Sequence, residues 1–178
     1  MQTQTRYYTV EEYLTLEETS ESKHEYWDGE IVVMAGGTTN HNEIAGNFYS
    51  HFKMAMRGQG YKIYMGDVKL SIPRYRLYTY PDIMVISGVP VYEGTGITIV
   101  TNPTLIVEVL LNSTHNYDRT NKFKMYRSIA PLQEYILIDQ YSANVEQFAK
   151  NSQDQWVLTE YESIQDNLVL HSMTFEIS

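Results

Sequence analysis

The chain has no cysteine among its 178 residues, which excludes disulfide bonds and thiolate metal sites. Any metal ion must therefore be held by oxygen atoms or by imidazole nitrogens. No apolar run approaches the roughly 18 residues that a membrane-spanning helix needs. The first five residues also lack the basic and apolar regions of a signal peptide, so we expect a cytoplasmic protein with no membrane segment.

Basic residues are scarce as well. The 13 lysines and arginines face 22 aspartates and glutamates, which gives a formal net charge of -9. A protein that binds DNA usually carries a basic surface, and the overall balance argues against tight nonspecific DNA binding. The acidic total does not exclude a local basic groove, because several lysines and arginines gather between residues 57 and 127.

The length and composition predict one domain over residues 1–178, with a hydrophobic core. No repeat, linker or low-complexity run divides the chain. In the first half, Thr9 and Glu12 predict a capping box, and Asp28-Gly29 predicts the turn of a hairpin. Asn40 and Glu43 predict the start of a second helix. We expect strands at 61–65, 68–72 and 82–86, with a loop at 73–80.

The second half predicts an α/β arrangement. An apolar strand at 104–110, a helix at 118–129 and a strand at 134–139 indicate a crossover with a parallel strand pair. Segments 144–150 and 155–161 predict a C-terminal antiparallel hairpin, and 168–177 predicts one or two edge strands. We therefore expect a central mixed sheet flanked by helices.

Glu108 is the first candidate for chemistry, because it interrupts an otherwise apolar strand. An unpaired carboxylate there costs several kcal/mol, so it needs a metal ion, a proton or a basic partner. A salt bridge with a buried lysine or arginine is the alternative interpretation. Asp82 follows Pro81 at the head of another apolar strand, where the alternative is a turn or capping aspartate.

Lys122 is the third candidate, and it bears on how the two acids are interpreted. Asp118, Lys122, Met125, Tyr126 and Ile129 share one stripe of the predicted helix, and the apolar members mark that stripe as the inward face. An inward lysine beside a buried glutamate can be a simple ion pair. Together with Asp82, the same pair can hold a divalent metal and stabilise the charge that develops on a phosphate.

Other polar residues carry weaker signals. His41 points inward from the first turn of its helix, but a hydrogen-bonded core histidine is the alternative. Glu25 can pair with a strand neighbour, and Glu43 is more typical of a cap than of a metal ligand. The tyrosines and arginines of residues 74–80 can contact a nucleic acid or lie in a solvated loop.

The chain resembles the Uma family over nearly its whole length. The resemblance lies in Tyr80-Pro81-Asp82, Leu105-Ile106-Val107-Glu108-Val109-Leu110, Tyr117-Asp118-Arg119 with Lys122 and Tyr126, Leu132-Gln133-Glu134-Tyr135-Ile136-Leu137-Ile138-Asp139, Glu25-Tyr26-Trp27-Asp28-Gly29-Glu30 and His41. Those proteins are restriction-endonuclease-like and belong to the PD-(D/E)XK nuclease superfamily. The resemblance implies a restriction-endonuclease-like fold, a mixed sheet flanked by helices.

The resemblance also assigns roles. Asp82 matches the motif aspartate and Glu108 the motif acid, whereas Leu110 stands where the superfamily pattern has a lysine. Lys122 matches the position of a lysine that has migrated to the following helix. A second departure is Leu111-Asn112-Ser113, where relatives more often have Ser-Pro-Ser.

These expectations combine into one functional hypothesis, a metal-dependent endonuclease that hydrolyses DNA phosphodiester bonds. Asp82 and Glu108 would hold Mg²⁺ or Mn²⁺ with a backbone carbonyl near Val109, and His41 and Glu25 would complete the site. Lys122 would orient the attacking water or neutralise charge in the transition state. The alternative is a catalytically silent binding or scaffold domain. A homodimer is expected, because cutting two strands needs two active sites.

Overall fold

The computed structural model describes residues 6–34, 36–111 and 117–178. The extreme N-terminus and the Asn112-Ser113 departure lie outside these residues. The larger of two main sheets has the strand order β11-β10-β9-β8-β6-β3. Its strands are β3 (Tyr61–Met65), β6 (Ile83–Ser87), β8 (Leu105–Leu110), β9 (Glu134–Asp139), β10 (Val145–Lys150) and β11 (Trp156–Tyr161).

The second main sheet has five strands in the order β2-β1-β5-β4-β7. They are β1 (His24–Trp27), β2 (Glu30–Val33), β4 (Lys69–Ile72), β5 (Leu77–Thr79) and β7 (Ile99–Val100). Near the C-terminus, β12 (Leu168–Val169) and β13 (Glu176–Ile177) pair with each other as a separate sheet. The α/β class and the C-terminal hairpin, β10 with β11, are confirmed, but the strands form two main sheets where one was expected.

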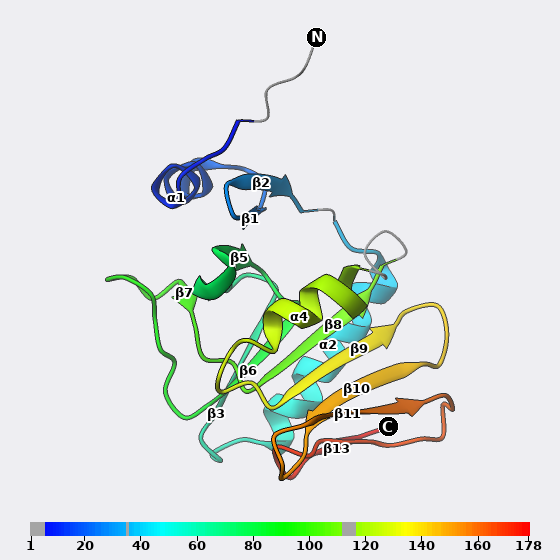
Figure 1. Ribbon diagram of the computed structural model, residues 1–178. Coiled ribbons are helices and arrows are strands. Elements are labelled where there is room, and N and C mark those ends of the chain that lie inside the picture. Colours follow the sequence, from blue (N-terminus) through cyan, green and yellow to red (C-terminus); the bar gives the residue numbers. More distant parts are fainter. Residues whose placement is uncertain (1–5, 35, 112–116) are drawn as a thin grey trace.

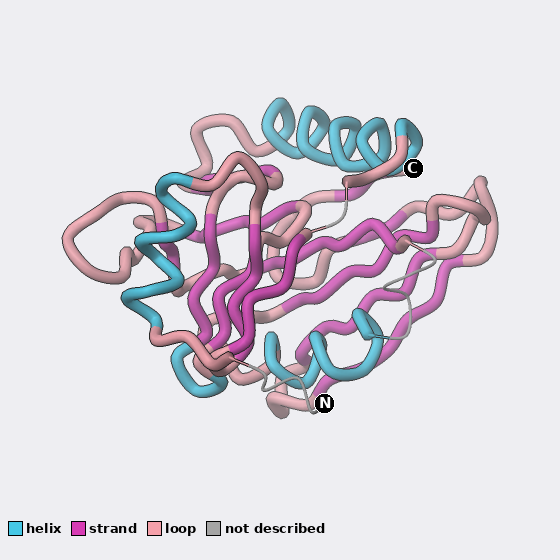
Figure 2. Tube along the Cα trace, turned by 90° about the horizontal axis from the view of Figure 1, so that it is seen from above, coloured by secondary structure: helices cyan, strands magenta, loops and turns pink. Residues whose placement is uncertain are grey.

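Helices cover both faces of the six-stranded sheet. The long helix α2 (Thr39–Ala55) passes behind β8 and β9, while a short helical segment lies in front of them (Figure 1). That segment is a π-helical turn, Asp118–Lys122, continued by α4 (Phe123–Tyr126). Seen from above, the strands form a layer between α2 and this segment (Figure 2). Helix α1 (Val10–Thr19) lies beside β1, and Pro73–Tyr75 forms a 3-10 turn.

Strand β8 lies inside the six-stranded sheet, between β9 and β6. It pairs in parallel with β9, as predicted, and antiparallel with β6, and all six of its residues are buried. Val107 and Val109 pack with Phe48 of α2 on one face. Ile106 and Leu110 pack with the α4 side on the other. Because side chains alternate along a strand, Glu108 points to the α4 face.

Several local predictions are confirmed. Thr9 and Glu12 form the capping box of α1, and Asp28 and Gly29, with φ of 46° and 107°, form the hairpin turn between β1 and β2. This is the left-handed conformation that a two-residue hairpin turn requires.

Other local predictions are wrong. The cap of α2 is Thr38, whose hydroxyl accepts from the backbone N–H of His41, and Asn40 lies inside the helix. The expected loop at 73–80 contains β5, because that segment pairs with both β1 and β4. The helix expected over 118–129 is shorter, since α4 ends at Tyr126.

No helix in the described part of the chain is both long and apolar enough to cross a membrane.

Candidate functional site

A pocket of about 410 Å³ opens where Asp82 precedes β6 and where β8 ends. All of the residues predicted for the site line it: Glu25, His41, Asp82, Glu108, Val109 and Lys122. They come from both main sheets, from α2 and from the π-helical turn. The structure therefore brings together side chains that are spread over almost a hundred positions of the sequence.

Asp82 and Glu108 are held together across the β6–β8 pair. The backbone N–H of Asp82 donates to Glu108 Oε2 at 3.2 Å, and the N–H of Val109 donates to Asp82 Oδ2 at 2.8 Å. The pairing of Ile83 with Val107 sets this register. Val109 thus contributes its N–H to the site, and the ligand role predicted for its carbonyl stays a prediction.

Lys122 reaches the same point from the helical side. Its Nζ lies 2.9 Å from Glu108 Oε1, 3.6 Å from Asp118 Oδ1 and 3.8 Å from Glu25 Oε1. Burial alone would lower the pKa of Lys122, but the neighbouring carboxylates, first that of Glu108, raise this pKa well above its ordinary value. Lys122 is therefore a cation held inside the protein by acidic groups.

Glu108 is nearly enclosed, with 5% of its side chain exposed. The hydroxyl of Tyr126 donates to its Oε1 at 2.7 Å. Burial raises the pKa of Glu108 to about 8, and Asp82 and Asp118 add to that rise, while Lys122 and the Tyr126 hydrogen bond oppose it. The carboxyl consequently gains from any further positive charge placed next to it.

His41 and Glu25 flank this core of the site. His41 Nε2 lies 3.0 Å from Asp82 Oδ2, and this hydrogen bond is the main cause of the raised pKa of His41. Glu25 accepts the indole N–H of Trp27 at 2.9 Å and the hydroxyl of Thr79. By contrast, Glu43 is exposed and does not line the pocket.

The sequence pattern alone gave no role to several residues of the site. Asp118, which lines the pocket, and Tyr126, which bonds Glu108 from behind it, lie on the inward stripe with Lys122, so the helical spacing could have pointed to them. Trp27 and Tyr117, whose rings stack at 4.8 Å, lie 90 positions apart in the chain, and no local pattern connects them.

Among the described residues, no group of three or more histidine, aspartate or glutamate side chains is arranged to hold a metal ion. Lys122 and Tyr126 contact Glu108, while His41 and the Val109 N–H contact one oxygen of Asp82. No described residue donates to the other oxygen, Oδ1, and 22% of the Asp82 side chain is exposed. Magnesium commonly uses one or two carboxylates and keeps several waters, so this donor set fits such an ion.

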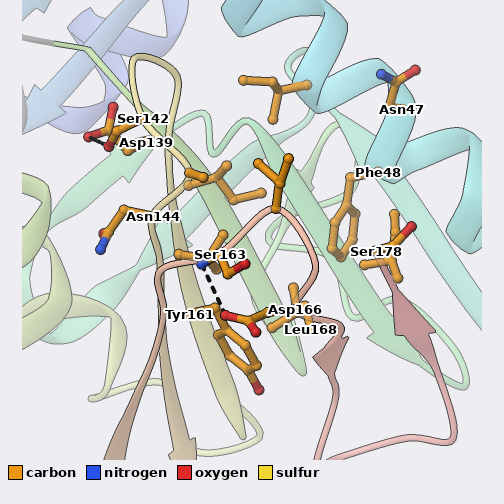
Figure 3. Close-up of a pocket in the computed structure, with 16 residues that line it drawn as sticks. Asn47, Phe48, Asp139, Ser142, Asn144, Tyr161, Ser163, Asp166, Leu168 and Ser178 are labelled. Carbon is orange, nitrogen blue, oxygen red and sulfur yellow. Dashed lines mark hydrogen bonds between the residues drawn. The ribbon is translucent and has the colours of Figure 1, made fainter.

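A second cavity, of about 390 Å³, lies on the α2 face of the sheet (Figure 3). Apolar side chains such as Ile44, Phe48 and Leu168 line much of it. Its polar groups form hydrogen bonds within their own turns. The Ser142 hydroxyl donates to Asp139 Oδ2, and the Ser163 N–H donates to Asp166 Oδ2. None of the predicted site residues lines this cavity.

Comparisons with known proteins agree with the resemblance seen in the sequence. The model of the Uma2 family, described as "putative restriction endonuclease", matches residues 10–178. The chain is 40% identical over 156 residues to the uncharacterized protein sll1609 of Synechocystis sp., which covers 88% of each chain. It is 36% identical over 163 residues to slr1290, another uncharacterized protein of that organism, covering 92% of this chain and 84% of the relative.

A solved structure shares the fold. The crystal structure of a "putative nuclease belonging to DUF820" from Anabaena variabilis superposes with a TM-score of 0.75, over 93% of this chain and 90% of the other. The sequence identity is 19%, so this likeness concerns the arrangement of helices and strands.

Proposed function

Because this chain belongs to the Uma2 family, we propose that it is a metal-dependent endonuclease that hydrolyses phosphodiester bonds in DNA. One observation carries the proposal: Asp82 and Glu108 meet across two neighbouring strands with the buried cation Lys122 at 2.9 Å from Glu108. Two acids that can hold a metal ion and a lysine that can stabilise negative charge are groups that metal-assisted phosphodiester cleavage can use.

The charge of the pocket supports a bound cation. Its lining includes four acidic side chains, those of Glu25, Asp82, Glu108 and Asp118, against one lysine and one histidine. A phosphate group would be repelled by such an excess of carboxylates. A divalent ion would offset most of this excess, since it adds two positive charges between the carboxylates and the substrate.

Asp82 and Glu108 would hold Mg²⁺ or Mn²⁺. When bound, such an ion supplies a Lewis acid for the phosphate and activates water at neutral pH. Lys122 stays protonated beside Glu108 and would neutralise charge that develops on the phosphate oxygens. His41 donates to Asp82 and orients its carboxylate, and Tyr126 does the same for Glu108.

The experiment is a cleavage assay on single-stranded and duplex DNA and RNA with Mg²⁺, Mn²⁺ or EDTA. We expect cleavage only with a divalent ion, and a loss of on the order of 10²-fold or more for Asp82→Asn, as for other preorganised electrostatic groups. Thermal melting of wild type and Asp82→Asn with and without Mn²⁺ gives a second readout, because an ion that binds the folded state raises its stability.

Asp139→Asn is a matched control, because this aspartate lies at the end of β9 and lines the second cavity. It should cleave like wild type. A wild type that neither cleaves any nucleic acid nor gains stability from Mn²⁺ would favour the alternative, a silent scaffold with a nuclease-like fold.

A further inference from the structure

A third pocket, smaller than the candidate site, adjoins that site. It has a volume of about 380 Å³, and Trp27 and Tyr117 line both pockets. These two rings stack with centroids 4.8 Å apart and planes inclined by 14°. The stacked pair therefore forms a wall that the two pockets share. A ligand that reaches across this wall contacts both pockets.

The remaining lining of the smaller pocket combines flat apolar surface with hydrogen-bonding groups. Tyr75 and Leu77 add to the aromatic and apolar part. Asn121 and Lys124 are exposed polar residues on the helical segment that also carries Lys122. Asn121 offers an amide that both donates and accepts, and Lys124 offers a cation.

Neighbouring arginines make this pocket less acidic than the candidate site. Asp28 lines it, but its Oδ1 forms an ion pair at 3.0 Å with Arg76. The guanidinium of Arg74 lies 5.9 Å from the ring centroid of Tyr75. Arg76 thus offsets Asp28, and Lys124 and Arg74 place positive charge around an aromatic surface, in contrast to the carboxylates of the candidate site.

We propose that the smaller pocket binds one unpaired base of a nucleic-acid strand, next to the phosphate held in the candidate site. The inference rests on the proposed function for the position of that phosphate. Aromatic rings stack with any base, an amide pairs with its polar edge, and a lysine contacts the adjoining phosphate. A base inside a duplex cannot enter such a pocket unless it leaves the stack. The substrate class is therefore single-stranded or locally unpaired nucleic acid.

The test measures binding with Ca²⁺, which can occupy an oxygen-ligand site in place of Mg²⁺, and electrophoresis checks that the probes stay intact. Trp27 and Trp156 are the two tryptophans of the chain, so a Trp156→Phe background makes indole fluorescence report on Trp27 alone. The probes are a five-residue oligothymidylate and a chain of five abasic deoxyribose phosphates, which has the same charges and no bases. We expect the oligothymidylate to quench Trp27 and to bind about 5- to 100-fold more tightly than the abasic chain, as for one base–aromatic stack.

Variants and a duplex probe sharpen the result. Asn121→Ala and Lys124→Met should weaken oligothymidylate binding several-fold, while Lys53→Met, an exposed lysine on α2, should leave it unchanged. Five thymidylates paired with adenylates inside a longer duplex with G·C pairs at both ends should not quench Trp27. Comparing the two single-stranded probes on the Trp156→Phe protein tests the pocket even where a pocket variant fails to fold.

The outcomes separate this inference from the proposed function. Equal binding of both single-stranded probes, or no binding of either, would overturn the base pocket, even if the wild type cleaves DNA. Base-dependent quenching in a protein that cleaves nothing would support the pocket and would contradict the nuclease.

Discussion

At the scale of single residues, Glu108 decides the electrostatics of the site. A carboxylate with 5% of its side chain exposed is costly unless charge and hydrogen bonds compensate it. Lys122 provides the charge and Tyr126 the hydrogen bond. The ion pair accounts for the burial of Glu108, and it is the neighbouring Asp82 that favours a metal site there.

The pair does predict how a variant behaves. Lys122→Met leaves Glu108 without its cation, and we expect the free energy of unfolding to fall by roughly 3–5 kcal/mol in metal-free buffer. Millimolar Mg²⁺ should restore part of this loss if an ion takes the place of the lysine beside Glu108. Urea denaturation with and without Mg²⁺ measures both effects.

Lys150→Met is the control for this prediction. The side chain of Lys150 is as covered as that of Lys122, at 10% against 11%, but its partner Asp154 is 82% exposed. An ion pair with an exposed partner contributes little, so the control should change stability by less than about 1 kcal/mol. Equal losses in the two lysine variants would contradict the special role of the buried pair.

At the scale of elements, Glu17 anchors α1 to the five-stranded sheet. Its Oε1 accepts hydrogen bonds from the backbone N–H of His24 at 3.0 Å and from the hydroxyl of Tyr80 at 2.7 Å. Its Oε2 lies 3.0 Å from His24 Nδ1. Tyr80 also lines the candidate site, so this anchor supports one of the site's walls. Burial raises the pKa of Glu17, but the hydrogen bonds outweigh burial and lower it below the ordinary value.

A lowered pKa in the folded state fixes the sign of the pH dependence. The stability that Glu17 contributes is present above the pKa of the unfolded chain and is lost as pH falls through the lower folded value. We therefore expect Glu17→Gln to melt below wild type at pH 7 and to approach it near pH 3. Melting curves at pH 7, 5 and 3 test this, with the exposed neighbour variant Glu18→Gln as control. A constant gap between wild type and Glu17→Gln across that range would refute the anchor.

At the scale of the whole molecule, the expected homodimer stays a prediction. Strand β11 is an edge of the six-stranded sheet, and its Val157 and Leu158 are 47% and 46% exposed. An open edge with apolar side chains can be covered by a second copy. Light scattering at micromolar concentration should give twice the mass of one chain.

A variant locates the interface. Leu158→Lys should shift the protein toward the monomer, because it places a charge on this edge. Met54→Lys, on the exposed side of α2, should not. A monomeric wild type would remove the dimer and, with it, the argument that two sites act together on a duplex.

Local patterns in the sequence were sufficient to single out Asp82, Glu108 and Lys122, which line one pocket of the structure. An acid inside an apolar strand and a lysine on an apolar helix stripe are visible within a few residues, because alternation and helical spacing decide which side chains point inward. For the same reason, the parallel pair of β8 with β9 and the hairpin of β10 with β11 could be predicted.

Long-range pairing decided the rest. The residues of segment 73–80 predict a loop by themselves. Part of the segment forms β5 because it pairs with β1 on one side and with β4 on the other. Likewise, the stack of Trp27 on Tyr117 joins parts of the chain that lie 90 positions apart. The free energy of such contacts depends on a partner far away in the sequence, and only the folded chain brings that partner into reach.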